Sequence, residues 1–336
     1  MPTLSKIMGL VFTSALCGHT FAHDWISSRP DAHAPISVMG DHTHKTGELM
    51  LSYRYMEMDM NELLDGKDEI NPRSLLKNST YKMAPTKMTM KMHMLGLMYA
   101  PDDTTTLMAM LPYLENDMDM LMNMGSSLSP MLMKSSMESS GIGDIRIGAL
   151  HNIYSDSRQK IHLNLLLSLP TGSIDEKNSQ GALLPYAMQL GSGTYDLLPG
   201  ITYAAQQESF SWGVQASAVI RLDENTRDYR LGNRYKVQSW VQKPLMRNLS
   251  ASLRFTYEDW GEINGKDKRL NPMMSPLSDA NLQGGKIVIG SVGFNLTLPA
   301  GNRLALEFNT ELNQDLDGLQ IAYEDSLMLG WQLSFK

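Results

Sequence analysis

The chain has 336 residues, is 42% hydrophobic, and carries 29 Lys and Arg against 36 Asp and Glu, which gives a net charge of −7. A general nucleic-acid binder needs a basic surface, so this acidic balance argues against nucleic acid as a partner. The single cysteine, Cys17, allows neither an internal disulfide nor a cysteine-based zinc site. The unusual count is 27 methionines, of which nineteen lie between Met50 and Met137.

Residues 1–22 have the pattern of a secretory signal peptide. Lys6 precedes a short apolar run, and the small Ala22 stands before a polar segment. We therefore expect export with cleavage near Ala22. Cys17 leaves a lipoprotein open as an alternative, although the bulky Leu16 stands where lipid attachment favours a small residue. No later stretch approaches the roughly 18–20 consecutive apolar residues of a spanning helix, so a membrane location requires a β-barrel.

Residues 47–336 show the period-two alternation of half-buried strands, for example Phe210, Trp212, Val214, Ala216, Ala218 and Ile220. The intervening positions are mostly small and polar. Twelve such segments are found, at about 47–60, 86–99, 105–115, 141–154, 160–170, 195–206, 209–221, 231–243, 249–260, 286–298, 302–313 and 325–335.

The connections alternate in length, which is the strongest signal in the sequence. Short turns occur at 101–104, 155–159, 207–208, 244–248 and 299–301, and longer loops at 61–85, 116–140, 171–194, 222–230, 261–285 and 314–324. This is the pattern of outer-membrane barrels, so we predict an all-β fold, a single antiparallel transmembrane β-barrel of about twelve strands, with short periplasmic turns and long extracellular loops. A secreted soluble all-β protein is the alternative, but its wet face would be more strongly charged.

The ends of the strands support the same location. The last segment alternates through Leu327, Leu329, Trp331, Leu333 and Phe335, similar to terminal strands that barrel-assembly machinery recognises. We expect outer-membrane lipid and that machinery as partners. A girdle of aromatic side chains at the membrane interfaces is predicted from Tyr53, Tyr55, Tyr99, Tyr113, Tyr154, Tyr203, Trp212, Trp240, Tyr257 and Trp260.

Alternation also predicts which polar side chains face the lumen. A lumen of this size holds or passes small molecules, and opposed Arg and carboxylate groups there set selectivity or neutralise one another. The predicted lumen-lining residues are Arg54, Asp144, Arg146, Gln215, Arg221, Arg254, Glu258, Arg303, Glu307 and Glu311.

The methionines recur at every second position, which places their thioethers on one face of a strand. Clustered thioethers suit Cu(I), whereas methionine is also an adaptable apolar filler. Arg54 should face the lumen, which places Met56, Met58 and Met60 of the same strand face there too. In the next strand the methionines lie on the opposite face from Lys91 and His93, and either face could be the one that lines the lumen. Acidic residues interleave with two of the runs. The candidate metal ligands here are Met56, Met58, Met60, Met88, Met90, Met92, Met94, Met118, Met120, Met122 and Met124.

Residues 23–46 are interpreted as an irregular periplasmic arm or a plug at the barrel mouth, because they are rich in proline, glycine and histidine. His42 and His44, one residue apart and preceded by Asp41, form a candidate metal pair. Cleavage after Ala22 would leave His23 at a new amino terminus able to chelate copper. Exposed loop histidines are the plain alternative.

Catalysis finds little support. Phospholipase A of the outer membrane is a twelve-stranded barrel that uses a Ser/His/Asn set on its outer wall, and His151 is the one histidine whose position suits that wall. No His-x-Ser pattern accompanies it. We predict that the protein is not an enzyme.

Two stretches resemble a known family. Residues 33–48 (HAPISVMGDHTHKTGE), followed by 50–56 (MLSYRYM), look like proteobacterial transporter-like members of the phenol-degradation meta-pathway barrel family. Gly141-Ile142-Gly143-Asp144 and residues 169–173 (LPTGS) are similar to that family's strand-and-loop signature. The resemblance implies an outer-membrane barrel with a small-molecule transport role, and the Met-rich branch looks associated with copper handling.

We therefore predict an outer-membrane channel or transporter for a small solute, linked to soft-metal handling through the Met-rich region. No cofactor is required, and Cu(I) is the one expected metal. Two alternatives stay open: an uptake channel for small aromatic or apolar compounds, and a non-transporting surface protein that sequesters metal.

Overall fold

A computed structural model describes residues 25–125 and 131–335. Within these residues, eleven antiparallel strands close into a barrel, and no helix is long and apolar enough to cross a membrane. The ring strands are β1 (Leu49–Gly66), β3 (Met83–Tyr99), β4 (Thr105–Asn123), β6 (Ile145–Ser155), β7 (Gln159–Leu169), β8 (Asp196–Gln206), β9 (Ser211–Arg221), β11 (Arg234–Pro244), β12 (Leu249–Trp260), β14 (Gly285–Thr297) and β15 (Asn302–Phe335). The predicted signal peptide lies outside the described residues.

The ring closes between the first and last strands. β15 pairs antiparallel with β14 through residues 303–316 and with β1 through residues 316–335. Its two ends lie side by side, because the Ser334 N–H donates to the Gly301 carbonyl at 3.0 Å. β15 is thus a long hairpin whose two halves run in opposite directions along the wall. These halves contain the predicted strands 302–313 and 325–335. The predicted barrel fold is confirmed, with loop 314–324 corrected to the tip of this hairpin.

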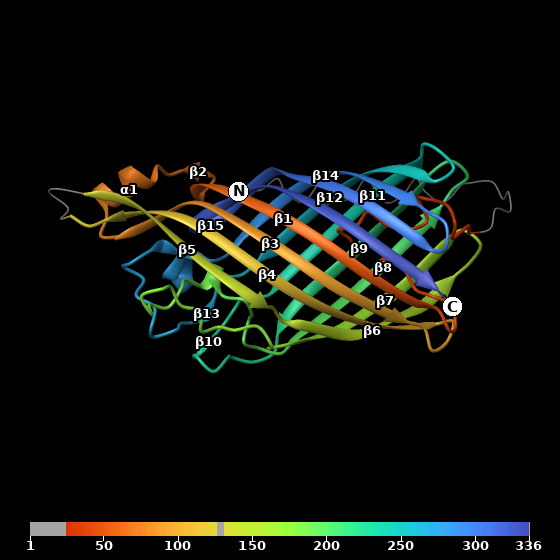
Figure 1. The fold of residues 1–336 in the computed structure, drawn as a ribbon, viewed down its shortest axis with the longest axis horizontal. Helices are drawn as coiled ribbons and strands as arrows, with labels where there is room; N and C mark the ends of the chain where they lie inside the picture. The colour runs from red at the N-terminus through yellow and green to blue at the C-terminus, as the bar shows by residue number, and fades with distance from the viewer. Residues whose placement is uncertain (1–24, 126–130, 336) are drawn as a thin grey trace, which may run out of the picture.

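One side of the wall is taller than the rest (Figure 1). β1, β3 and β4 are 17 to 19 residues long, whereas most strands on the opposite side have 11 to 13. β5 (Leu132–Ile142) pairs with β4 alone and lies outside the ring, as does β2 (Asp68–Glu69), which pairs with β1. The prediction of a long loop at 116–140 was therefore wrong: β4 continues to Asn123 and the chain returns as β5. The alternation of Met with Asp there is strand periodicity.

The remaining elements lie at the end of the barrel toward which β1, β3 and β4 extend (Figure 1). α1 (Pro72–Asn78) begins after Asn71, whose side chain accepts hydrogen bonds from the first helical N–H groups. β10 (Tyr229–Arg230) pairs with β13 (Asn264–Gly265), and three 3-10 turns occupy residues 186–188, 276–278 and 280–282. The C-terminus lies at the opposite end of the barrel (Figure 1).

Alternation sets the two faces of the wall. On β3, Leu95 and Leu97 are exposed on the outside, while Met94 and Met98 are buried inside. The methionines of the second and third predicted strands therefore face the lumen, and Lys91 and His93 share the outer face with Leu95. Trp240 is a correction to the predicted girdle: it points inward and packs against Ala34 and Val38.

Residues 25–46 precede β1 and lie inside the end of the barrel where the C-terminus is found. Val38 is fully buried against Trp240, and Ile36 packs against Ala305 and Met328 of the wall. Because none of the described strands pairs with this segment, other groups must satisfy its backbone.

Candidate functional site

The N-terminal arm, residues 25–46, is held by side chains of the barrel interior. Six wall side chains donate to its backbone carbonyls at 2.5 to 2.9 Å. The pairs are Ser250 with Pro30, Ser211 with Asp31, Gln242 with His33, Arg303 with Ala34, Gln215 with Met39, and His162 with Gly40. In the reverse direction, the Ser37 N–H donates to the Glu307 carboxylate at 2.9 Å. The arm is therefore fixed in place by directional bonds from many strands.

One of those donors, Gln215, belongs to a ladder of buried polar side chains on the inner face of the wall. The Arg254 Nε lies 2.7 Å from Glu307 Oε1, and its Nη2 donates to Asn309 Oδ1 at 2.6 Å. Gln238 donates to Gln215 at 2.7 Å, and Gln215 donates to Thr202 at 2.8 Å. All these groups are buried, so each needs its partner. We call this side of the lumen, carried by β8, β9, β11, β12 and β15, the polar wall.

The opposite side of the lumen is apolar. A buried cluster beside the arm collects Met50, Met94, Met98, Met108, Met110, Leu150 and Leu166. A second cluster, toward the tall end, collects Met88, Met118, Met120, Met137, Leu184, Met188 and Leu277, the last three supplied by loops that fold over it. We call the inner face of β1, β3 and β4 that carries most of these residues the methionine wall. Met39 of the arm packs against the first cluster.

The arm separates two cavities. The first has a volume of about 700 Å³ and is lined by residues 31–34 and 41–45 of the arm together with strand ends such as Arg303 and Ser334. The second, of about 220 Å³, lies beyond Ser37, Met39 and Gly40 and is lined by Met108 and Met110 on one side and Gln238 and Glu258 on the other. The arm thus enters as a loop whose tip is residues 37–40.

Alternation placed the predicted lumen residues on the inner face. Arg54, Gln215, Arg254, Glu258, Arg303 and Glu307 are buried, and Asp144, Arg146, Arg221 and Glu311 are half-buried. Asp196, which pairs with Arg221, was missed, as were Gln238, Gln242, Asn295 and Asn309. These residues alternate with outward-facing apolar residues along their strands, and this alternation could have identified them as facing the lumen.

The predicted metal ligands fall into separate groups. Met88, Met94, Met118 and Met120 are buried on the methionine wall, Met56, Met58, Met60, Met90, Met92 and Met122 are half-buried, and Met124 is exposed beyond β4. Glu57, Asp59, Asp117 and Asp119 lie on the opposite strand face from the neighbouring methionines, so carboxylates and thioethers of one strand do not meet. His23 lies outside the described residues.

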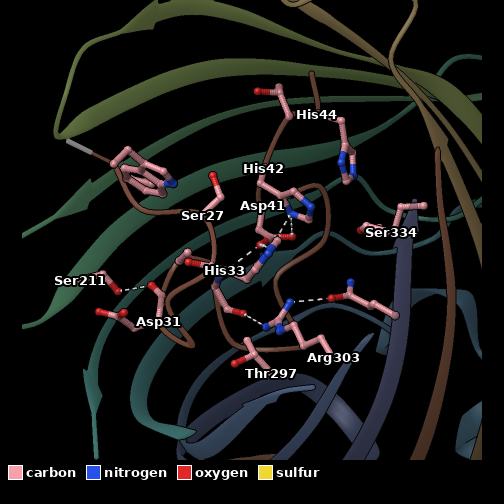
Figure 2. A pocket seen from close by; sticks show the side chains of 18 of the residues that line it. Ser27, Asp31, His33, Asp41, His42, His44, Ser211, Thr297, Arg303 and Ser334 are labelled. Carbon is pink, nitrogen blue, oxygen red and sulfur yellow. Dashed lines mark hydrogen bonds and ion pairs between the residues drawn. The ribbon is translucent and has the colours of Figure 1, made fainter. Parts of the chain in front are cut away.

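The arm brings three other groups together at the base of its loop (Figure 2). His33 Nδ1 lies 3.3 Å from His42 Nδ1, and Asp41 Oδ1 lies 2.9 Å from His42 Nδ1. One potential ligand atom from each residue lies within 4.8 Å of the others. His44 stands beside His42 with ring centroids 4.7 Å apart. The sequence predicted a metal pair of His42 and His44. The fold adds His33, which lies beside His42 and Asp41.

Burial sets the protonation of the flanking rings. Burial, followed by the charges of His42 and Arg303, holds the pKa of His33 well below its usual 6.5. Burial and the charge of His42 lower the pKa of His44 to about 4, against a smaller raising effect of Glu48. Both rings are therefore neutral at pH 7, since burial disfavours the charged form.

Comparison with known proteins identifies a matching family and solved structures of similar fold. A family model described as a putative MetA-pathway of phenol degradation matches residues 84–308. The crystal structure of an outer membrane channel from Pseudomonas putida F1 shares 14% identity, with a TM-score of 0.61, and the match covers 89% of this chain and 99% of that one. The P. putida toluene transporter TodX matches at 9% identity and a TM-score of 0.45, covering 87% and 91% of the two chains. No curated protein matches the chain.

Proposed function

The chain belongs to the family described as a putative MetA-pathway of phenol degradation, and from that premise we propose that it is an outer-membrane channel for small apolar or aromatic solutes. The observation that carries this proposal is the two-sided lumen. Methionine and leucine side chains continue along one side, from the tall end to the arm. An apolar solute would meet a continuous apolar surface along that side.

Methionine suits such a pathway. Its unbranched, polarizable side chain adapts to ligands of different shape, so a methionine surface accepts apolar molecules without one fixed fit. The polar wall opposite is occupied by its own hydrogen bonds and by the arm, which leaves the apolar side as the surface that a hydrophobic solute can contact. In the conformation described, the arm fills the space between the cavities, so passage requires it to shift.

Uptake into proteoliposomes tests the proposal. Met94→Gln and Met110→Gln replace buried thioethers of the methionine wall by polar groups of similar length. We expect uptake of a small aromatic compound such as toluene to fall several-fold, with flux of a small charged solute unchanged. Met246→Gln is the matched control, because Met246 is 66% exposed in the turn between β11 and β12. Equal aromatic uptake by the wild type and both wall variants, all shown to be folded by heat-dependent gel mobility, would contradict the proposal.

Soft-metal binding is a second candidate, favoured by the five methionines of the cluster nearest the tall end. Several thioethers in one place suit Cu(I). Competition with a Cu(I) chromophoric chelator would test it, comparing the wild type with Met118→Leu/Met120→Leu. Leucine keeps the apolar packing and removes the sulfur, so unchanged copper retention in that variant would reject this candidate.

A further inference from the structure

We propose that His33, Asp41 and His42 bind a divalent transition-metal ion of the Zn²⁺ type, which fastens the base of the arm's loop. His33 stands on the limb that enters the barrel, and the other two stand on the limb that returns. The tip between them, residues 37–40, reaches the second cavity. An ion here would join the two limbs below that tip, in the chemistry of a structural metal site.

The distances suit such an ion. Zinc bound tetrahedrally at about 2.0–2.1 Å from imidazole nitrogen places neighbouring ligand atoms about 3.3 Å apart. His33 Nδ1 and His42 Nδ1 are 3.3 Å apart, Asp41 Oδ1 is 2.9 Å from His42 Nδ1, and Asp41 Oδ2 is 3.9 Å from His33 Nδ1. Two imidazoles and a carboxylate are ligands that zinc and its neighbours in the first transition series prefer.

Hydrogen bonding alone serves these groups poorly. A neutral imidazole Nδ1 carries either a proton or a lone pair. If His42 Nδ1 carries the proton and donates it to Asp41 at 2.9 Å, His33 Nδ1 lies 3.3 Å from a donor already used and 3.9 Å from the carboxylate. If His42 Nδ1 carries no proton, its lone pair faces the carboxylate oxygen at 2.9 Å. A metal ion between the three residues would be bound by both Nδ1 atoms and by the carboxylate together.

The surroundings orient the ligands as outer groups do in metal sites. The Ala34 N–H donates to Asp41 Oδ2 at 3.0 Å, which directs Oδ1 toward His42. Arg303 bonds to Ala34, Asn295 and Gln332, and the ion pairs found for Asp41 in the described chain are with histidines. His44 is 6% exposed and its Nε2 has no partner among those residues, which makes it the candidate fourth ligand. The cavity of about 700 Å³ beside the cluster provides an entry path.

Metal retention by the purified full chain in detergent tests the site. Protein stripped with a chelator is incubated with Zn²⁺, passed through a gel-filtration column and analysed for bound zinc, and Co²⁺ is then used as a spectroscopic probe. We expect one zinc ion per chain in the wild type, and its loss in His42→Asn and Asp41→Asn. His151→Asn, at an exposed histidine of β6, is the matched control and should keep the ion.

A further variant separates ligand loss from misfolding. His42→Cys supplies a thiolate, another zinc ligand, at the same position. We expect this variant to retain zinc and, with Co²⁺, to gain a thiolate charge-transfer band. A wild type that retains no zinc, zinc retention unchanged in folded His42→Asn, or a folded His42→Cys without metal would each overturn the proposal. Because no transport is measured, these outcomes are independent of the proposed channel function.

Discussion

The methionine wall and the polar wall line the same lumen but are stabilised by different physics. Met118 and Met120 are held by packing, which is non-directional and depends on apolar area and volume. Arg254 and Glu307 are held by a buried ion pair whose remaining donors and acceptors also need partners. We therefore expect the methionine wall to tolerate other apolar side chains. The polar wall, which binds most of the arm's backbone, has few acceptable substitutes.

Breaking the buried ion pair should have the largest effect. Glu307→Gln removes the charge opposite Arg254 and weakens the acceptor of the Ser37 N–H. Leaving one partner of a buried pair uncompensated costs about 3–5 kcal/mol. We expect a correspondingly lower thermal unfolding midpoint, measured by heat-dependent gel mobility. Glu115→Gln, an exposed carboxylate on the outer face of β4, is the control. Equal midpoints for the two variants would contradict the assignment of Glu307 to the ladder.

Emptying the methionine wall should be somewhat less damaging. Met118 is fully buried, so Met118→Ala leaves a cavity and should destabilise the barrel by about 2–5 kcal/mol. Met118→Leu keeps the volume and should cost less than about 1.5 kcal/mol. Denaturant titration of both variants measures the difference. Similar losses for alanine and leucine would mean that the sulfur, and not apolar packing, is what this wall requires.

A smaller change should act on the arm without disturbing either wall. Val38→Thr keeps the shape of a fully buried side chain but adds a hydroxyl beside Ala34 and Trp240. An unpaired buried hydroxyl costs about 1–3 kcal/mol, and here the cost falls on the docked arm. We expect a larger open fraction in planar-bilayer recordings, with the unfolding midpoint of the barrel little changed. An unchanged open fraction would show that the arm does not limit passage.

The smallest effect is expected outside the lumen. Lys87 and Asp59 pair at 3.5 Å on the outer face of β3 and β1, where both side chains are partly exposed. Such a pair contributes about 0–1 kcal/mol. Lys87→Gln should therefore leave the unfolding midpoint within error of the wild type. A clearly lower midpoint would contradict this and would show that the exposed pair contributes substantially to the stability of the barrel.

Local alternation was sufficient to predict the barrel and the face of most wall residues. A strand's side chains alternate regardless of its neighbours, so Arg254, Arg303 and Glu307 were assigned to the lumen without coordinates. The same rule applied to Trp240 would have placed it inside instead of in the girdle. The extension of β4 to Asn123 and the strand β5 were not predicted, because Asp117 and Asp119 resemble loop residues. In the structure they occupy exposed positions of β4 that alternate with buried methionines.

Local sequence is enough to predict that the chain forms strands, that these strands have an apolar outer face, and that the methionines gather in one region, because each is a property of residues close together along the chain. The folded chain is needed to show where the arm lies, which loops cover the methionines, and that His33 meets Asp41 and His42. The physical reason is that the arm has no periodicity of its own, and its course is imposed by hydrogen bonds from side chains such as Gln242 and Arg303, more than 200 residues away in the chain.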